Sequence, residues 1–200
     1  MSKQIDLTSG NIVEKLVKLS LPIMGTAFIQ IAYSLIDMIW VGKIGSKSVA
    51  AVGTAGFYPW LAMAFIMISK VGGEIKVAQS VGEKNEKDTK YYIKSAIEIN
   101  MLLSFLYSLV LIFFKSPLIG FFKLGDMEVI NMSEQYLVIV GLGMMFYFIN
   151  PVFTSIFVGL GNSKLPFKIN TIGLVTNIIL DPVLIFGIGP LPEMGVAGAA

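Results

Sequence analysis

The segment that most constrains this chain runs from Leu21 to Val41 and is almost continuously apolar, with a single carboxylate, Asp37, near its end. A helix of this length covers about 30 Å, which matches the thickness of the hydrocarbon core of a bilayer. An ionisable side chain at membrane depth is costly unless it has a partner or a use. We therefore expect a membrane span at 21–41 and an ion or proton site at Asp37.

The chain as a whole is too apolar for a soluble domain. Of its 200 residues, 55% are hydrophobic and 14% are charged, and the mean hydropathy is +0.78. This composition indicates an integral membrane protein. All 15 basic residues are Lys, and the absence of His and Cys excludes imidazole bases, thiolate nucleophiles and most zinc sites. We therefore expect neither an enzyme nor a cofactor, and lysines scattered between apolar runs do not indicate a nucleic-acid partner.

Five apolar runs separated by polar segments predict an all-α fold with five membrane helices. The amphipathic stretch at 12–19 predicts a helix on the membrane surface, so residues 1–20 are interpreted as a cytoplasmic amino-terminal segment. Residues 115–134 are expected to form a loop, and residues from about 195 to open a sixth span. Residues 21–200 are thus expected to form one transmembrane lobe. The predicted spans are about 21–41, 52–81, 91–114, 135–159 and 167–188.

The distribution of lysines predicts the orientation of these spans. Ten lysines lie near span ends on the side of the amino terminus and four on the opposite side, which places the amino terminus in the cytoplasm of a multi-pass inner-membrane protein. The spans at 21–41 and 167–188 then both run outward. Asp37 lies sixteen residues into the first and Asp181 fourteen into the second. Both carboxylates are therefore expected at similar depth in the outer half of the membrane.

Each of these two spans carries a polar stripe along one helical face. Gln30, Tyr33 and Asp37 are spaced i, i+3 and i+7 in the span at 21–41. Asn177 and Asp181 lie together on one face of the span at 167–188. Two such stripes indicate a shared wet cavity.

The residue types in this cavity suit a cation. Pro182 lacks an amide hydrogen and so frees the carbonyl of Ile178, next to Asn177 and Asp181. Carboxylate, amide and carbonyl oxygens are ligands for a hard cation such as sodium, and a carboxyl group alone suffices for a proton. The pattern does not choose between the two ions. The plainer alternative is that these groups only hydrogen-bond helix to helix; two carboxylates with no Lys at the same depth argue against it.

Several other residues have a plain interpretation. Pro22 lies in the first turn of its span, where a missing donor costs little. Asn150 and Thr154 form a polar group in the middle of the fourth span, and Tyr136 and Tyr147 are interpreted as interfacial anchors or packing residues.

Taken together, the motifs carry a resemblance to a known family. LPIMGTAFIQIAYSLIDMIWVGKIG, SVAAVGTAGFYP, VGLGNSKLPFKIN and NIILDPVLIFG follow one another in this order. From about residue 10 onward the chain resembles the amino-terminal half of a multidrug and toxic compound extrusion (MATE) transporter. The resemblance implies twelve helices in two six-helix lobes around a central cavity, with the carboxy-terminal lobe outside this chain.

The resemblance also implies roles for individual residues. Asp37, Asn177 and Asp181 would form the cation site of the amino-terminal lobe, and a coupling sodium ion would bind there. Further cavity residues would be Gln30, Tyr33, Thr154 and Asn150, and helix bends would lie at Pro22 and Pro182.

The expected function is that of a secondary active antiporter, which exports organic cations or drugs in exchange for sodium ions or protons. Two alternatives remain open. One is a flippase of lipid-linked sugars, which the acidic cavity and the absence of Arg argue against. The other is a truncated membrane subunit that binds partners and transports nothing.

Overall fold

The computed structural model describes residues 12–188 and 192–200, and this part of the chain is entirely helical. Five segments are long and apolar enough to cross a membrane, which confirms the five predicted spans. The second of them consists of two consecutive helices, α2 and α3. The helices are α1 (Ile12–Ile44), α2 (Ser46–Ala55), α3 (Phe57–Gly82), α4 (Glu86–Phe113), α5 (Lys115–Gly120), α6 (Met127–Gly159), α7 (Lys164–Phe186) and the 3-10 helix η1 (Gly195–Ala199).

Helix α1 is longer than the sequence indicated. It begins at Ile12 and passes without a break through 12–19, where a separate surface helix was expected. Pro22 lies inside it, and the hydroxyl of Thr26 donates a hydrogen bond of 3.0 Å to the carbonyl of Pro22. Because α1 already begins at Ile12, Pro22 is not in a first turn as expected, and its missing amide hydrogen leaves the carbonyl of Lys18 without its helical donor.

The second span starts earlier than predicted and is interrupted. It runs from Ser46 to Gly82, with a break at Gly56 between α2 and α3. The amide of Gly56 lies 2.7 Å from the carbonyl of Val52, and a Cβ atom on Gly56 would lie 2.7 Å from the same oxygen. Because Pro59 has no amide hydrogen for the carbonyl of Ala55, the hydrogen-bond ladder is also incomplete here.

The prediction of a loop at 115–134 is wrong for much of this segment. Residues Lys115–Gly120 form α5, and α6 already begins at Met127. The carboxylate of Asp126 caps α6 by accepting a 2.8 Å hydrogen bond from the amide of Glu128. Helix α5 is held against α3 because the hydroxyl of Tyr58 donates to the carbonyl of Leu118.

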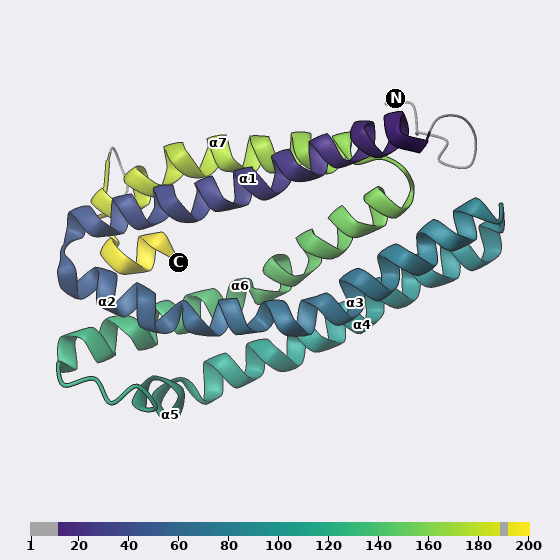
Figure 1. Ribbon diagram of the computed structural model, residues 1–200. Helices are drawn as coiled ribbons and strands as arrows, with labels where there is room; N and C mark the ends of the chain where they lie inside the picture. The colour runs from purple at the N-terminus through teal and green to yellow at the C-terminus, as the bar shows by residue number, and fades with distance from the viewer. Residues whose placement is uncertain (1–11, 189–191) are drawn as a thin grey trace.

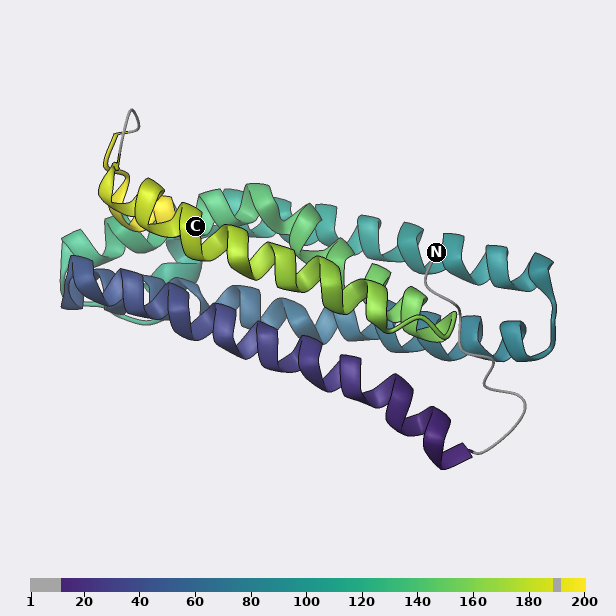
Figure 2. The same cartoon turned by 90° about the horizontal axis from the view of Figure 1, so that it is seen from above.

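The helices form two groups. Helices α3 and α4 make an antiparallel hairpin, and α6 packs against both of them. Helices α1 and α7 pack against each other on the other side of α6 (Figure 1). Seen from above, α1 diverges from α7 toward its own amino-terminal end (Figure 2). The start of α1, the α3–α4 turn and the α6–α7 turn all lie at one end of the molecule.

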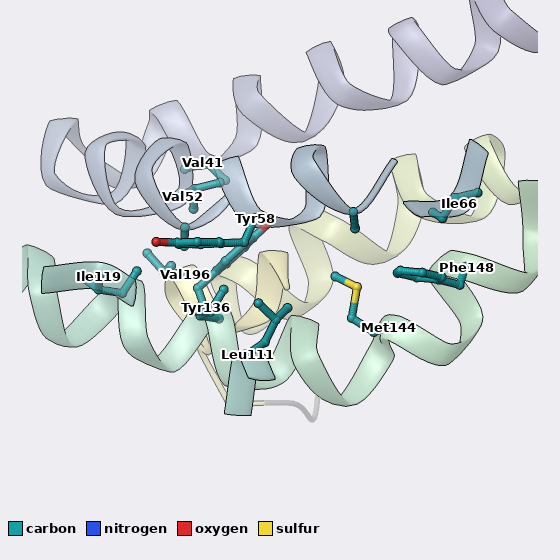
Figure 3. Packing of buried hydrophobic residues seen from close by; sticks show 13 residues of the cluster. Val41, Val52, Tyr58, Ile66, Leu111, Ile119, Tyr136, Met144, Phe148 and Val196 are labelled. Carbon is teal, nitrogen blue, oxygen red and sulfur yellow. The ribbon is translucent and has the colours of Figure 1, made fainter. Parts of the chain in front are cut away.

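The buried apolar core lies within the first group. Its members come from α2, α3, α4, α5 and α6, and include Tyr58, Met144 and Phe148 (Figure 3). Helix α1 contributes Val41 and η1 contributes Val196, whereas no core residue of this cluster comes from α7. The core therefore fixes α3, α4 and α6 to one another and holds the α1–α7 pair mainly by the end that carries Val41.

Candidate functional site

Helices α1 and α7 run parallel and in register along their shared face. Near one end the ring of Phe167 lies over Gly25, where an added Cβ atom would be 2.6 Å from the ring. Near the other end the rings of Trp40 and Phe186 pack edge to face, with centroids 6.2 Å apart. Residues about 142 to 146 positions apart in sequence are thus neighbours across the pair. This register brings residue 37 level with residue 181.

Asp181 and Asn177 form the buried part of the site, one helical turn apart on α7. Asp181 is only 6% exposed, and the side-chain amide of Asn177 donates a hydrogen bond to its Oδ1. Within the described residues, Asp181 Oδ2 and Asn177 Oδ1 are both buried without a hydrogen-bond partner. Pro182 leaves the carbonyl of Ile178 without its usual helical donor. One turn of α7 therefore presents several oxygen atoms that lack donors.

Asp37 supplies a second carboxylate from α1. It is half-buried and interacts electrostatically with Asp181, and Tyr33, one turn earlier on α1, interacts with both. None of the ion pairs in the part of the chain that the structure describes involves either carboxylate. Two like charges in a poorly hydrated place repel each other, and a bound cation or proton relieves that repulsion.

Tyr136 is a site residue that the sequence did not reveal. It lies on α6, is 8% exposed, and interacts electrostatically with Asp37, Tyr33 and Tyr147. Its sequence context predicts an anchor or packing residue, because a tyrosine near the end of a span is usually one. Its interaction with Asp37 reaches from α6 to α1, and the sequence pattern does not pair those two helices.

The remaining predicted cavity residues lie farther along the helices. Gln30 is exposed on α1, two turns before Asp37. Thr154 and Asn150 contact each other on α6, with their oxygens 3.5 Å apart. Since a helix rises about 1.5 Å per residue, Asn150 lies about 21 Å along α6 from Tyr136. The structure therefore does not bring Asn150 and Thr154 to the carboxylates.

The donor set fits a small cation. Asp37, Asp181, Asn177 Oδ1 and the Ile178 carbonyl offer only oxygen atoms, which hard monovalent cations prefer. A proton on one of the two carboxyl groups would relieve the same repulsion between Asp37 and Asp181. This region can therefore take up one positive charge between two helices.

Comparison with known proteins identifies the family. Residues 22–183 match the family model described as MatE. The chain is 27% identical over 191 residues to a probable multidrug resistance protein NorM of Thermotoga maritima, covering 94% of this chain and 40% of that protein. It is 26% identical to a FAD transporter of Shewanella oneidensis, covering 100% of this chain and 44% of the relative.

The fold agrees with that result. A solved structure of the outward-facing conformation of a multidrug resistance MATE family transporter superposes with a TM-score of 0.85 at 25% identity, covering all of this chain and 43% of the other. The chain thus spans less than half the length of the relatives it matches. Sequence, fold and membrane helices agree, and the chain belongs to the MatE family of multidrug and toxic compound extrusion transporters.

Proposed function

We propose that this chain forms the ion-coupling lobe of a secondary active antiporter that exports organic cations in exchange for sodium ions or protons. The observation that carries the proposal is the pairing of Asp37 with Asp181 across two parallel helices, next to buried oxygens that lack donors. A membrane protein has little other use for two adjacent carboxylates without a neighbouring cation.

Charge compensation explains how the site couples two fluxes. When the site is empty, Asp37 and Asp181 repel each other and attract any cation that reaches the cavity. One sodium ion or proton binds between them and cancels part of that charge. An organic cation is attracted by the same field, so the two compete, and binding of one favours release of the other.

The residues around the carboxylates have separate tasks in this scheme. Asn177 holds Asp181 Oδ1 through its amide hydrogen and offers its own Oδ1 to the ion. Tyr33 and Tyr136 interact electrostatically with Asp37 and contribute polar hydroxyl groups to this region. Pro22 and Pro182 each interrupt the hydrogen-bond ladder of a helix in the pair, which gives α1 and α7 places to bend during alternating access.

The proposed orientation places the amino terminus in the cytoplasm. The α3–α4 turn and the α6–α7 turn lie at the same end of the molecule as the start of α1 (Figure 1). Lys84 lies in the α3–α4 turn, and Lys87 and Lys90 follow at the start of α4; Lys164 and Lys168 lie at the start of α7. Lysine-rich ends favour the cytoplasmic side of an inner membrane. Asp37 and Asp181 then lie in the outer half of the lobe.

Complete transport requires a second lobe. The relatives are more than twice as long as this chain, and a cavity between two lobes cannot alternate with one lobe alone. We propose that a carboxy-terminal lobe completes the transporter and that the lipid bilayer and organic cations are its other partners.

An anionic cargo is the second candidate, because one relative is named a FAD transporter. The two carboxylates argue against it here, as they do against a flippase of lipid-linked sugars. Counterflow into vesicles, with ethidium and FAD each offered as the only cargo, separates the two candidates. Our proposal predicts uptake of ethidium and not of FAD.

The direct test is Asp37→Asn in the full-length gene product, reconstituted in vesicles with sodium and proton gradients imposed separately. We expect efflux of a fluorescent organic cation to stop, whichever gradient drives the normal protein. Glu98→Gln is the matched control, because Glu98 is an exposed carboxylate on α4 paired with Lys94. Ion-driven efflux that survives Asp37→Asn would reject the proposal.

A further inference from the structure

A groove lies between α3 and α4, away from the carboxylates. It has a volume of about 240 Å³ and is open along one side. Because the two helices are antiparallel, its residues fall into levels, from Lys76 and Tyr92 at the end near the α3–α4 turn to Ile68 and Ile99 toward the middle of the hairpin. The walls are completed by Ser69, Gly72, Gly73, Ser95 and Ala96.

One end of this groove is cationic. The ammonium group of Lys76 lies 5.9 Å from the centre of the Tyr92 ring, and Ser95, one turn of α4 from Tyr92, also lines the groove. Among the residues that the structure describes, no carboxylate forms an ion pair with Lys76. Lys94, on the same helix as Tyr92, differs in that Glu98 lies 3.5 Å away. The charge of Lys76 is thus uncompensated at the end of the groove.

The rest of the groove is apolar and open. Ser69 presents no free donor, since its hydroxyl donates to the carbonyl of Ile66 and accepts from the amide of Asn100. Gly73 allows α3 to approach α4, because a Cβ atom there would lie 2.8 Å from that of Ala96. Gly72 faces open space, with no atom within 4 Å of an added Cβ. Ile68 at the inner end is 64% exposed.

We propose that this groove binds an anionic phospholipid, with the phosphate group at Lys76, Tyr92 and Ser95 and an acyl chain lying along Gly72 toward Ile68. A cation at one end and an apolar channel at the other match the polarity of a lipid molecule. Lys76 lies six residues before the end of α3, so its Cα is about 9 Å from that helix end, and a lysine side chain reaches the headgroup level from there.

Charge complementarity favours an anionic lipid over a zwitterionic one. A single lysine near a membrane surface favours an anionic headgroup by about fivefold. The inference is independent of the ion site, because neither Asp37 nor Asp181 lines the groove.

A site-specific quenching experiment tests it. The chain contains no Cys, so Ile99→Cys in the full-length protein, with any cysteine elsewhere replaced by Ser, places one bimane label at the inner end of the groove. The protein is reconstituted in phosphatidylcholine vesicles that contain increasing fractions of dibrominated phosphatidylglycerol or dibrominated phosphatidylcholine. Leu102→Cys supplies the control label, because Leu102 is 60% exposed on the same helix and does not line the groove.

We expect half-maximal quenching at position 99 at about one fifth the fraction of phosphatidylglycerol compared with phosphatidylcholine, and no such difference at position 102. Lys76→Gln should remove the preference, whereas Lys94→Gln should retain it. Gly72→Leu should fill the groove without a clash and reduce quenching by both lipids at position 99 only.

Three results would overturn the proposal. The first is equal quenching at position 99 by both lipids. The second is a preference for phosphatidylglycerol that survives Lys76→Gln. The third is an absence of quenching by either lipid at position 99, which would show that protein covers the groove.

Discussion

The lobe contains two regions that differ in how much apolar surface they bury against one another. Helices α3, α4 and α6, with α2 and α5, share a core that includes Met144 and Phe148, which are fully buried. Helices α1 and α7 contact each other along their length, but α1 adds only Val41 to that core and α7 adds no residue. We call the first region the framework and the second the α1–α7 pair.

The polar site lies on the less buried of the two regions. Asp37, Tyr33, Asn177 and Asp181 all belong to the pair, and Tyr136 interacts with Asp37 and Tyr33 from the framework. Elements with few buried contacts are the ones that open or shift at low cost. The comparison suggests that ion binding changes the position of the pair while the framework stays fixed.

The largest expected effect is on stability of the framework. Phe148→Ala removes a fully buried ring and should lower the free energy of unfolding by about 3–5 kcal/mol. Phe28→Ala in the pair is the matched control, because Phe28 is 73% exposed and its loss should cost less than about 0.5 kcal/mol. Unfolding in mixed micelles measures the free energy of unfolding of both variants. Equal losses of that free energy would show that the two regions do not differ in burial.

A second prediction concerns the contact inside the pair. Gly25→Val places a side chain against the ring of Phe167 and should push α1 away from α7, so most ion-driven efflux should be lost while unfolding of the framework changes little. Gly42→Val is the control, because no atom lies within 4 Å of a Cβ there.

Adding Phe167→Ala to Gly25→Val makes room for the new side chain and should restore efflux. Failure of this second substitution to rescue transport would contradict the role given to the α1–α7 contact. Loss of efflux in the control variant Gly42→Val would also contradict that role.

The smallest expected effect is on the link between α2 and α6. Lys47 bridges Asp126 at 2.9 Å and Glu128, on the surface. The hydrogen bond from Lys47, together with the amide of Glu128, holds the pKa of Asp126 below its ordinary value of 3.8. A lowered pKa stabilises the folded state above that ordinary value, and the contribution is lost as pH falls below it.

Lys47→Met should therefore produce a slight increase in hydrogen exchange at the start of α6 at neutral pH, and the increase should disappear as the pH falls through the lowered pKa of Asp126. High salt should reduce the difference. An effect that is unchanged by acid and by salt would show that Lys47 acts through packing instead.

Much of the fold follows from the sequence because a bilayer imposes length and polarity on each span. The five apolar runs located the membrane helices, and counting residues from their ends predicted similar depth for Asp37 and Asp181. The register of α1 and α7 brings these two residues level with each other. The break at Gly56 was not predicted, since Gly and Pro leave the apolar pattern of a span intact.

Other features depend on which helices become neighbours. Tyr136 on α6 interacts with Asp37 on α1, although its own sequence context is that of an ordinary anchor. Asn150 and Thr154 lie far along α6 from Tyr136, so their expected place in the substrate cavity stays a prediction. Periodicity predicts which face of a helix is polar, and it does not predict which helix that face meets.

The most direct test of the central claim, that Asp37 and Asp181 form one site, is a double-mutant cycle on ion-driven efflux with Asp37→Asn, Asp181→Asn and both together. Two carboxylates that share one ion act as a unit, so each single variant should lose as much coupled efflux as the double variant. Losses that add independently, or coupled efflux that persists in either single variant, would contradict the account.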